Sequence, residues 1–224
     1  MPNWTNNKII GKKEMLEQFL SPEGDFDFNK LIPMPEELDI TSGGIEYDSV
    51  VAYYLSLDKQ QQQALKKELS LKKSHCYSSY ARTYLSDEKI QLAKKKYPDG
   101  FPAEYVAIGQ KYIFNIRKYG WSQWHDWCCA NWGTKWNVAD TYVSEADENG
   151  NITVIFCTAW SAPSGIIEKL AEFFDDGEFH WEYQNEDPDP TTIHILEKVH
   201  GAIVETLEED EDCEKFLEAV AALS

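Results

Sequence analysis

The residues best suited to chemistry lie near the carboxyl end of the chain, and they are carboxylates. Seven of them fall within ten positions: Glu205, Glu208, Glu209, Asp210, Glu211, Asp212 and Glu214. A negative surface this dense can bind a basic groove and can imitate a nucleic-acid backbone. Such a run also keeps a protein soluble, and this alternative stays open. We take the seven as candidate partner-binding residues.

An aromatic segment is the second candidate, because residues 119–136 contain five Trp in eighteen positions. Trp121, Trp124, Cys128 and Trp132 follow helical spacing, which is typical of a helix packed against a sheet. The alternative is an exposed shelf that stacks bases or anchors a partner protein. Trp121 and Trp124 therefore join the candidate partner-binding residues.

His125, Cys128 and Cys129 are of residue types that bind metals, and they lie close together in the sequence. A structural zinc site uses four ligands that usually arrive in pairs, and the sequence offers no second pair beyond His75 and Cys76. We expect no metal and no cofactor, with thiols that behave as small apolar groups.

Catalytic motifs are missing from the sequence. It contains no G-x-S-x-G nucleophile elbow, no Walker-type glycine-rich loop and no H-E-x-x-H pair. Spacing alone does not select a general acid and base among 39 Asp and Glu residues. We predict that the protein is not an enzyme and assign no catalytic residue.

The formal charge of −18 predicts that duplex DNA and anionic membranes repel the molecule. The charge is uneven, since residues 59–118 are net basic and residues 139–224 carry 22 Asp and Glu against three Lys. The lysines at 66–73 and 94–96 are suited to nucleic acid, to the solvent side of amphipathic helices, or to pairing with the acidic segment. We expect a basic protein partner; direct nucleic-acid binding is the alternative.

Targeting signals are also missing. No apolar run reaches the length needed to cross a bilayer, and MPNWTNNKII lacks the layout of a signal peptide. Five irregularly spaced Cys fit a reducing compartment. We expect a cytoplasmic protein with no membrane partner.

Hydrophobic periodicity predicts the elements. Strands are expected at 3–10, at FDFNKLI with Phe26 and Phe28 on one face, in DTYVSEA and NITVIFCTAW, and at 178–183. The Asn-Gly pair in DENGN predicts a hairpin. Helices are expected after Gly11, throughout 45–131, at 161–174, and in the tail.

This order predicts an α+β protein: a ferredoxin-like split βαβ antiparallel sheet with a long helical insertion and an acidic helical tail. The predicted core comprises residues 1–40 and 132–185. The predicted helical insertion comprises residues 45–131, and the acidic C-terminal helical segment comprises residues 186–224.

Three motifs carry a family resemblance: PNWTNN, then FDFNKLIPMPEEL, then NWGTKWN followed by FCTAWSAP. The sequence resembles the YubB-type ferredoxin-like domain family of phages and conjugative plasmids. The resemblance implies the fold and a mobile-element origin and transfers no catalytic residue. This chain has Thr5 where the first motif often has Cys, and the acidic tail stands where a glycine-rich strand is expected.

Together these features favour a phage-encoded inhibitor that binds a host defence protein with a basic groove in the bacterial cytoplasm. A CRISPR–Cas effector is one such target, so the expected activity is anti-CRISPR-like counter-defence, with nucleic-acid mimicry as one mode. The alternative is a nucleic-acid-binding module of a mobile element. It would use the lysine-rich insertion and sheet aromatics, for which Trp4, Phe26, Phe28 and Trp160 are candidates.

Overall fold

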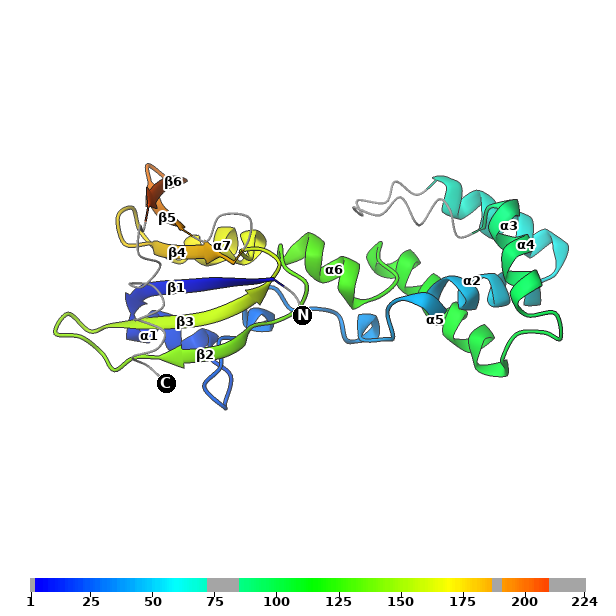
Figure 1. Ribbon diagram of the computed structural model, residues 1–224, viewed down its shortest axis with the longest axis horizontal. Helices are drawn as coiled ribbons and strands as arrows, with labels where there is room; N and C mark the ends of the chain where they lie inside the picture. The colour runs from blue at the N-terminus through cyan, green and yellow to red at the C-terminus, as the bar shows by residue number, and fades with distance from the viewer. Residues whose placement is uncertain (1–2, 72–84, 187–190, 210–224) are drawn as a thin grey trace. The chain divides into compact units, whose positions relative to one another are not determined.

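The computed structural model describes residues 3–71, 85–186 and 191–209 (Figure 1). The chain divides into two compact units. The ferredoxin-like unit comprises Met1–Pro33 and Asn131–Ser224, and the helical unit comprises Met34–Ala130. The helical unit is thus inserted into the sequence of the other.

The described residues of the ferredoxin-like unit form a six-stranded antiparallel sheet with strand order β2-β3-β1-β4-β5-β6. Two short helices, α1 and α7, flank it on one face (Figure 1). The bounds are β1 (Trp4–Lys12), α1 (Lys13–Leu16), β2 (Ala139–Val143), β3 (Asn151–Ala159), α7 (Ser164–Ala171), β4 (His180–Asn185), β5 (Thr192–Val199) and β6 (Ala202–Glu209).

Topology identifies the fold. The chain passes from β1 through α1 to β2, and β3 lies between these two strands in the sheet. It then passes from β3 through α7 to β4, with β1 in between. Two interlocked split βαβ units of this kind form the ferredoxin-like α+β fold, which confirms the predicted fold class.

Alternation along β1 explains which face of the sheet is covered. Thr5, Asn7, Ile9 and Gly11 are buried, whereas the residues between them are half-buried. Because successive side chains of a strand point to opposite faces, the buried set faces the helices. In β3 the matching set includes Phe156, which is fully buried and lies 5.7 Å from Trp181 of β4, ring centre to ring centre.

The predicted hairpin is confirmed. Strands β2 and β3 pair antiparallel around the turn that contains Asn149 and Gly150, and Gly150 has a φ of 75°. Asp147 Oδ1 accepts hydrogen bonds from the backbone N–H groups of Asn149 and Asn151, both at 2.8 Å. The turn is therefore fixed by positive φ and by a side chain that satisfies its backbone donors.

The expected strand at FDFNKLI is wrong. Phe26 makes only an isolated bridge to Leu20, and Phe28–Lys30 forms a 3₁₀ turn, η2. The backbone N–H of Phe28 donates to Asn137 Oδ1 at 3.0 Å instead of to a neighbouring strand. Phe26 and Phe28 are nevertheless fully buried, and their rings pack on Phe156. Burial of both rings explains the apolar pattern. Hydrogen bonds to side chains such as Asn137 take the place of hydrogen bonds between neighbouring strands.

The expected helical tail is also wrong where the structure describes it. Residues 192–209 form the hairpin of β5 and β6, which extends the sheet beyond β4. The turn contains His200 and Gly201, both with positive φ. The segment forms strands and not a helix because the backbone N–H and C=O groups of each strand pair with those of an antiparallel neighbour. Residues 210–224 lie outside the described residues.

The helical unit contains helices α2 (Gly44–Ser56), α3 (Lys59–Leu71), α4 (Asp87–Lys96), α5 (Ala103–Tyr119) and α6 (Trp124–Asn131), which ends one residue beyond the unit, and the 3₁₀ turn η3 (Glu36–Leu38). Its core includes Val50 and Val51 of α2 and Tyr112 and Ile113 of α5. The Tyr112 hydroxyl donates to the carbonyl of Thr41. No helix among the described residues is long and apolar enough to span a membrane.

Candidate partner-binding groove

The predicted carboxylates fall into two groups. Glu205, Glu208 and Glu209 lie on β6, the edge strand of the sheet within the described chain. All three are exposed, and strand alternation places Glu205 and Glu209 on one face and Glu208 on the other. Asp210, Glu211, Asp212 and Glu214 lie outside the described residues.

The predicted aromatic candidates belong to the helical unit. Trp121 and Trp124 are half-buried, whereas Trp127 and Cys128 are buried. Burial raises the pKa of the Cys128 thiol to about 12, so this group is a neutral thiol at neutral pH. Among residues that the structure describes, no group of three or more His, Cys, Asp and Glu lies close enough to hold a metal.

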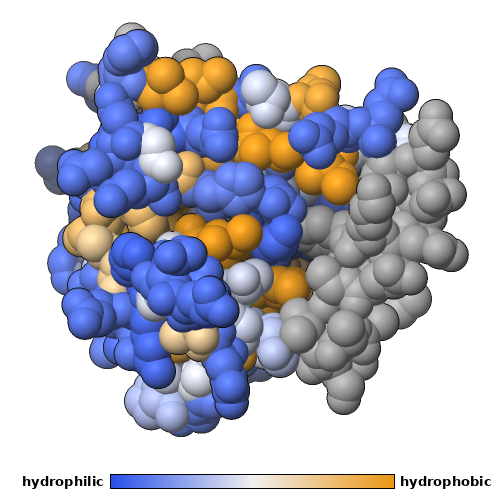
Figure 2. Space-filling view, turned by 90° about the vertical axis from the view of Figure 1, so that its left-hand side faces the viewer, coloured by the Kyte–Doolittle hydropathy of each residue, from blue (hydrophilic) through white to orange (hydrophobic). Residues whose placement is uncertain are grey.

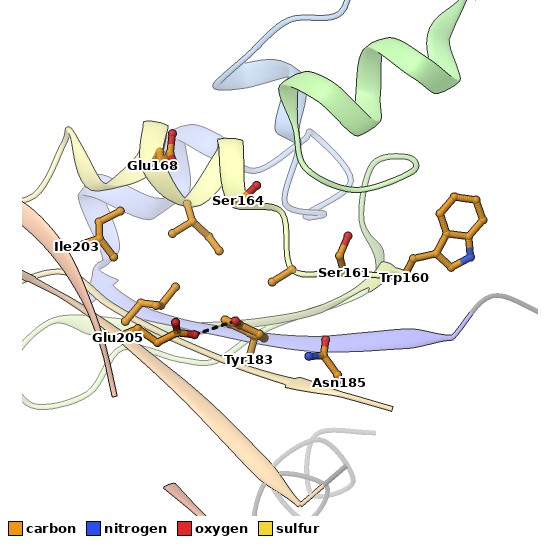
Figure 3. Close-up of a pocket in the computed structure, with 11 residues that line it drawn as sticks. Trp160, Ser161, Ser164, Glu168, Tyr183, Asn185, Ile203 and Glu205 are labelled. Atoms are coloured by element: carbon orange, nitrogen blue, oxygen red, sulfur yellow. Dashed lines mark hydrogen bonds between the residues drawn. The ribbon is translucent and has the colours of Figure 1, made fainter. Parts of the chain in front are cut away.

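A groove in the ferredoxin-like unit brings together residues that the sequence did not connect (Figure 3). It has a volume of about 470 Å³ and lies between α7, the loop after β3, and strands β4, β5 and β6. Ala162, Ile167, Leu196 and Ile203 supply its apolar surface. The more polar or aromatic lining residues are Trp160, Ser161, Ser164, Glu168, Tyr183, Asn185 and Glu205.

Glu205 is held in a defined position at this groove. Its Oε1 accepts a hydrogen bond from the Tyr183 hydroxyl at 2.9 Å and lies 2.7 Å from His194 Nδ1. The rings of Tyr183 and His194 are stacked, with centres 4.3 Å apart and planes 7° from parallel. Hydrogen bonding, first from His194 and also from Tyr183, lowers the pKa of Glu205. The groove therefore presents an oriented carboxylate at neutral pH.

Trp160 lies at the other end of the groove, in a conformation unusual for a bulky residue. Its φ is 76° and half of its surface is exposed. Its N–H donates to the carbonyl of Asn3 at 2.8 Å, and the next residue, Ser161, donates through Oγ to the carbonyl of Gly133 at 2.7 Å. Backbone strain of this kind persists where surrounding contacts impose it, and it is frequent at binding sites.

Lys135 lies beside Trp160. Its Nζ is 4.4 Å from the ring centre of Trp160 and 4.4 Å from that of Trp136. Such cation–π contacts orient a tryptophan by its ring face. The Trp160 ring is therefore positioned both by its backbone and by a cation.

A second hollow continues the groove along α7. It has a volume of about 350 Å³ and shares Glu168 and Ile203 with the first. Its other lining residues include Glu172 and Lys198. Lys198 Nζ donates to the carbonyls of Ala171 and Phe174, so its charge stabilises the carboxyl end of α7.

The net charge of the protein resides in the ferredoxin-like unit. Its sequence holds 27 Asp and Glu against eight Lys and Arg, whereas the helical unit holds 12 against 13. Several basic side chains of the helical unit pair within that unit, as in Lys66–Asp87, Lys96–Asp48, Arg117–Glu68 and Lys118–Glu37. The lysine-rich insertion thus meets carboxylates of its own unit.

One end of the ferredoxin-like unit is covered largely by hydrophilic side chains, with separate hydrophobic patches between them (Figure 2). Among the described residues, the large exposed apolar side chains of this unit are Trp160, Phe173, Val199, Val204 and Leu207. Three of these five belong to the β5–β6 hairpin, so the edge of the sheet combines carboxylates with apolar side chains.

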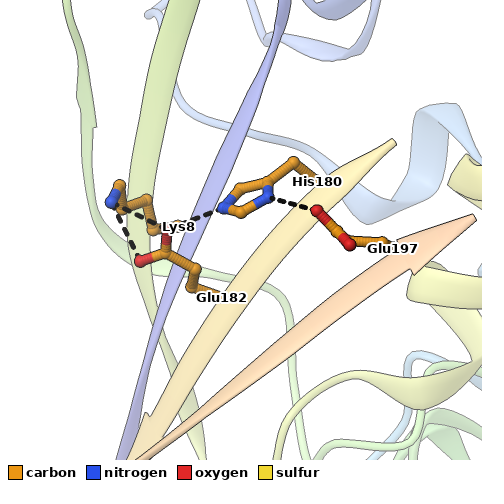
Figure 4. A network of polar contacts seen from close by, with 4 residues as sticks. All are labelled: Lys8, His180, Glu182 and Glu197. Atoms are coloured by element: carbon orange, nitrogen blue, oxygen red, sulfur yellow. Dashed lines mark hydrogen bonds and ion pairs between the residues drawn. The ribbon is translucent and has the colours of Figure 1, made fainter. Parts of the chain in front are cut away.

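A polar network occupies the opposite face of the sheet (Figure 4). Lys8 Nζ lies 2.9 Å from a Glu182 oxygen, and His180 Nε2 lies 2.7 Å from the other. His180 Nδ1 lies 3.7 Å from Glu197. The hydrogen bond to Glu182 raises the pKa of His180. These groups satisfy one another, so we assign them a structural role.

Of the groove residues, Glu205 and Trp160 were candidates from the sequence, whereas Glu168, Tyr183 and the others were not. The available signal was FCTAWSAP, whose last four residues all line or adjoin the groove. Phe26 and Phe28, proposed as base-stacking residues if exposed, are in the core and unable to stack on a base.

The fold and groove define an α+β protein with a ferredoxin-like domain and a partly apolar, acidic surface groove. Residues 131–218 match a protein family described as "Ferredoxin-like domain in Api92-like protein". The ferredoxin-like character expected from the sequence motifs is thereby confirmed.

Among solved structures, the chain is similar to the crystal structure of a protein api92 from Yersinia pseudotuberculosis. The two are 12% identical with a TM-score of 0.40, and the match covers 93% of this chain and 98% of that one. A comparison with curated proteins found no match.

Proposed function

We propose that this protein is an acidic binding protein that captures a basic partner protein through its ferredoxin-like unit. The observation that carries the proposal is the concentration of charge, with 27 carboxylates against eight Lys and Arg in one unit and near balance in the other. A surface of one sign accelerates association with an opposite surface and repels nucleic acid.

The more specific form of the proposal is counter-defence: a phage-encoded inhibitor that occupies the basic groove of a host defence protein in the bacterial cytoplasm. The motif resemblance to phage and plasmid proteins supports it, as does the acidic strand β6 with Glu205, Glu208 and Glu209. Carboxylates spaced along a strand can take the place of nucleic-acid phosphates in such a groove. The proposal involves no catalytic step.

Direct nucleic-acid binding is the competing function. It is disfavoured because Phe26 and Phe28 are buried and because four basic side chains of the insertion, those paired above, already contact carboxylates. Single-stranded nucleic acid requires both a basic track and exposed aromatic faces.

The test is capture from nuclease-treated bacterial lysate on immobilised full-length protein, followed by elution with NaCl from roughly 50 to 500 mM. We expect a basic protein to be retained at low salt and released as salt rises. The matched variant replaces Glu205, Glu208 and Glu209 by Gln and should release the partner at lower salt. A gel shift of single-stranded RNA or DNA by the purified protein, or no specific capture, would contradict the proposal.

A further inference from the structure

We propose that the groove between α7 and the β5–β6 hairpin binds an extended basic segment of a partner protein. In this complex an apolar side chain of the segment rests on the groove floor, and flanking Lys or Arg side chains pair with Glu168 and Glu205. The inference rests on the proposed function and adds to it a site, a recognition mode and a class of sequence.

The floor of the groove accounts for the apolar part of the recognition. Ile167 of α7, Leu196 of β5 and Ile203 of β6 come from three different elements and meet at one surface. Ile167 and Leu196 are themselves buried, so the surface that they present is fixed by the core. A rigid apolar floor gives binding energy at low entropic cost, because little has to be ordered when the partner arrives.

Carboxylates on two sides of this floor account for the recognition of Lys and Arg side chains in the partner. Glu168 lies on α7 and Glu205 on β6 (Figure 3). Among the described residues, Tyr183 and His194 both bind Oε1 of Glu205, so Oε2 can accept a hydrogen bond from an ammonium or guanidinium group. Because Tyr183 and His194 already orient this carboxylate, a partner gains a charge-assisted hydrogen bond without paying to position it.

The second hollow argues for an extended segment over a small molecule. Glu168 and Ile203 line both hollows, so the carboxylates and the apolar floor continue along α7 towards Glu172. Glu168 and Glu172 are one helical turn apart and exposed, and Lys169 already forms an ion pair with Glu172. An extended peptide repeats its side chains on one face at every second residue, and it therefore matches alternating apolar and acidic positions.

Trp160 supplies an anchor at the end of the groove. Its ring is half exposed, and Lys135 occupies a position over it at 4.4 Å. Tryptophan is among the residues that contribute most at protein interfaces. Trp160 directly follows β3, and a positive φ in a bulky residue is backbone strain of the kind that is frequent at binding sites.

The charge of the first hollow favours a basic occupant, although Lys198 lines the second hollow and Lys135 lies against Trp160. A phosphate-bearing ligand would meet Glu168 and Glu205 and be repelled. The chain's own residues 210–224 contain five carboxylates against one lysine, so their composition is unsuited to the same groove. A basic segment of another protein fits both the charge and the floor.

The experiment measures binding of a short fluorescein-labelled peptide that alternates arginine and leucine to the full-length protein by fluorescence anisotropy. Glu168→Gln with Glu205→Gln should weaken binding roughly tenfold or more. The matched control, Glu145→Gln with Glu148→Gln, changes net charge equally on the β2–β3 turn and should weaken it less than about twofold. A peptide alternating arginine and serine should bind more weakly, because it leaves the floor empty.

Amide chemical-shift mapping on the wild-type protein gives a readout that does not depend on variants. The peptide should shift signals of Trp160, Ile167, Leu196 and Ile203. Equal loss of peptide affinity in the two double variants, or chemical-shift changes spread over the unit, would contradict the groove as the binding site. Partner capture from lysate would in that case still support the proposed function. Loss of salt-sensitive capture overturns the proposed function itself, whatever the peptide does.

Discussion

Gly165, the second residue of α7, lies against the backbone of the segment that precedes β2. Its N–H donates to the carbonyl of Trp132 at 3.2 Å, and a Cβ at this position would lie 2.0 Å from the carbonyl oxygen of Asn131. The Trp132 indole in turn donates to the carbonyl of Ile32 at 2.9 Å. The second and third of the motifs that carry the family resemblance, or residues next to them, are thus joined by direct contacts. These contacts require the absence of a side chain at Gly165 and the indole of Trp132.

A methyl group at Gly165 should therefore destabilise the ferredoxin-like unit. We expect Gly165→Ala to cost about 2 to 3 kcal/mol, because a backbone carbonyl has to move to admit the Cβ. The matched control is Gly44→Ala, since a Cβ at Gly44 meets nothing within 4 Å. Chemical denaturation of both variants measures the difference, and equal midpoints for Gly165→Ala and the wild type would show that the close approach carries no cost.

At the scale of elements, local signals predicted those parts of the fold that a few residues determine. Asp58 and Ser86 are of residue types that favour helix N-caps, and the side chain of each accepts a hydrogen bond from the backbone N–H three residues later. The Asn-Gly turn likewise required only its own residues. These elements could be read from the sequence because their hydrogen bonds are local.

The tail was predicted wrongly although the partners of its strands lie close in the sequence, since β5 pairs with β4 and with β6. IHILEKVHGAIVETLEE has apolar residues at spacings compatible with both a helix and a strand, and its strands carry polar residues on both faces. The β-branched content of this segment was the available signal. The groove could not be predicted for the same reason, since it exists only where this hairpin lies beside α7.

The pair of His180 and Glu182 on β4 should make stability depend on pH. The pKa of His180 is raised above its ordinary value of 6.5, so its contribution is complete below pH 6.5 and is lost as the pH rises through the higher folded value. Burial raises the pKa of Glu182, but hydrogen bonds from His180 and Lys8 outweigh it and lower the pKa below 4.5. The contribution of Glu182 is present above pH 4.5 and is lost in acid.

A double-mutant cycle of His180→Gln and Glu182→Gln, measured by urea denaturation, tests this expectation. The coupling free energy should be largest between about pH 5 and pH 6 and should shrink by pH 9, where the imidazole is neutral. A coupling that is the same at both ends of this range would mean that the pair interacts as neutral groups.

At the scale of the whole molecule, the charge of the sequence divides along the boundary between the two units. Pairing of the basic block with the acidic segment was one alternative from the sequence. By composition the helical unit balances its own charge, with ion pairs inside the unit, and the ferredoxin-like unit carries the excess of carboxylates. The boundaries of the units and ion pairs such as Arg117–Glu68, which joins separate helices, come from the structure and not from the sequence. We therefore assign partner capture to the ferredoxin-like unit.

Removal of the helical unit tests this assignment. The bond from the Trp132 indole to the Ile32 carbonyl brings the two ends of the ferredoxin-like unit together, so a short Gly/Ser linker can replace residues 34–130. The described strands and their core phenylalanines all lie outside that range, so we expect the shortened protein to fold. Near-UV circular dichroism should show cooperative unfolding. The shortened protein should also elute from an anion exchanger at salt similar to the full chain and retain salt-sensitive partner capture. If the shortened protein folds but captures no partner, the binding surface lies in the helical unit, where Trp121 and Trp124 are the candidates. If it shows no near-UV signal, the ferredoxin-like unit depends on its insertion to fold.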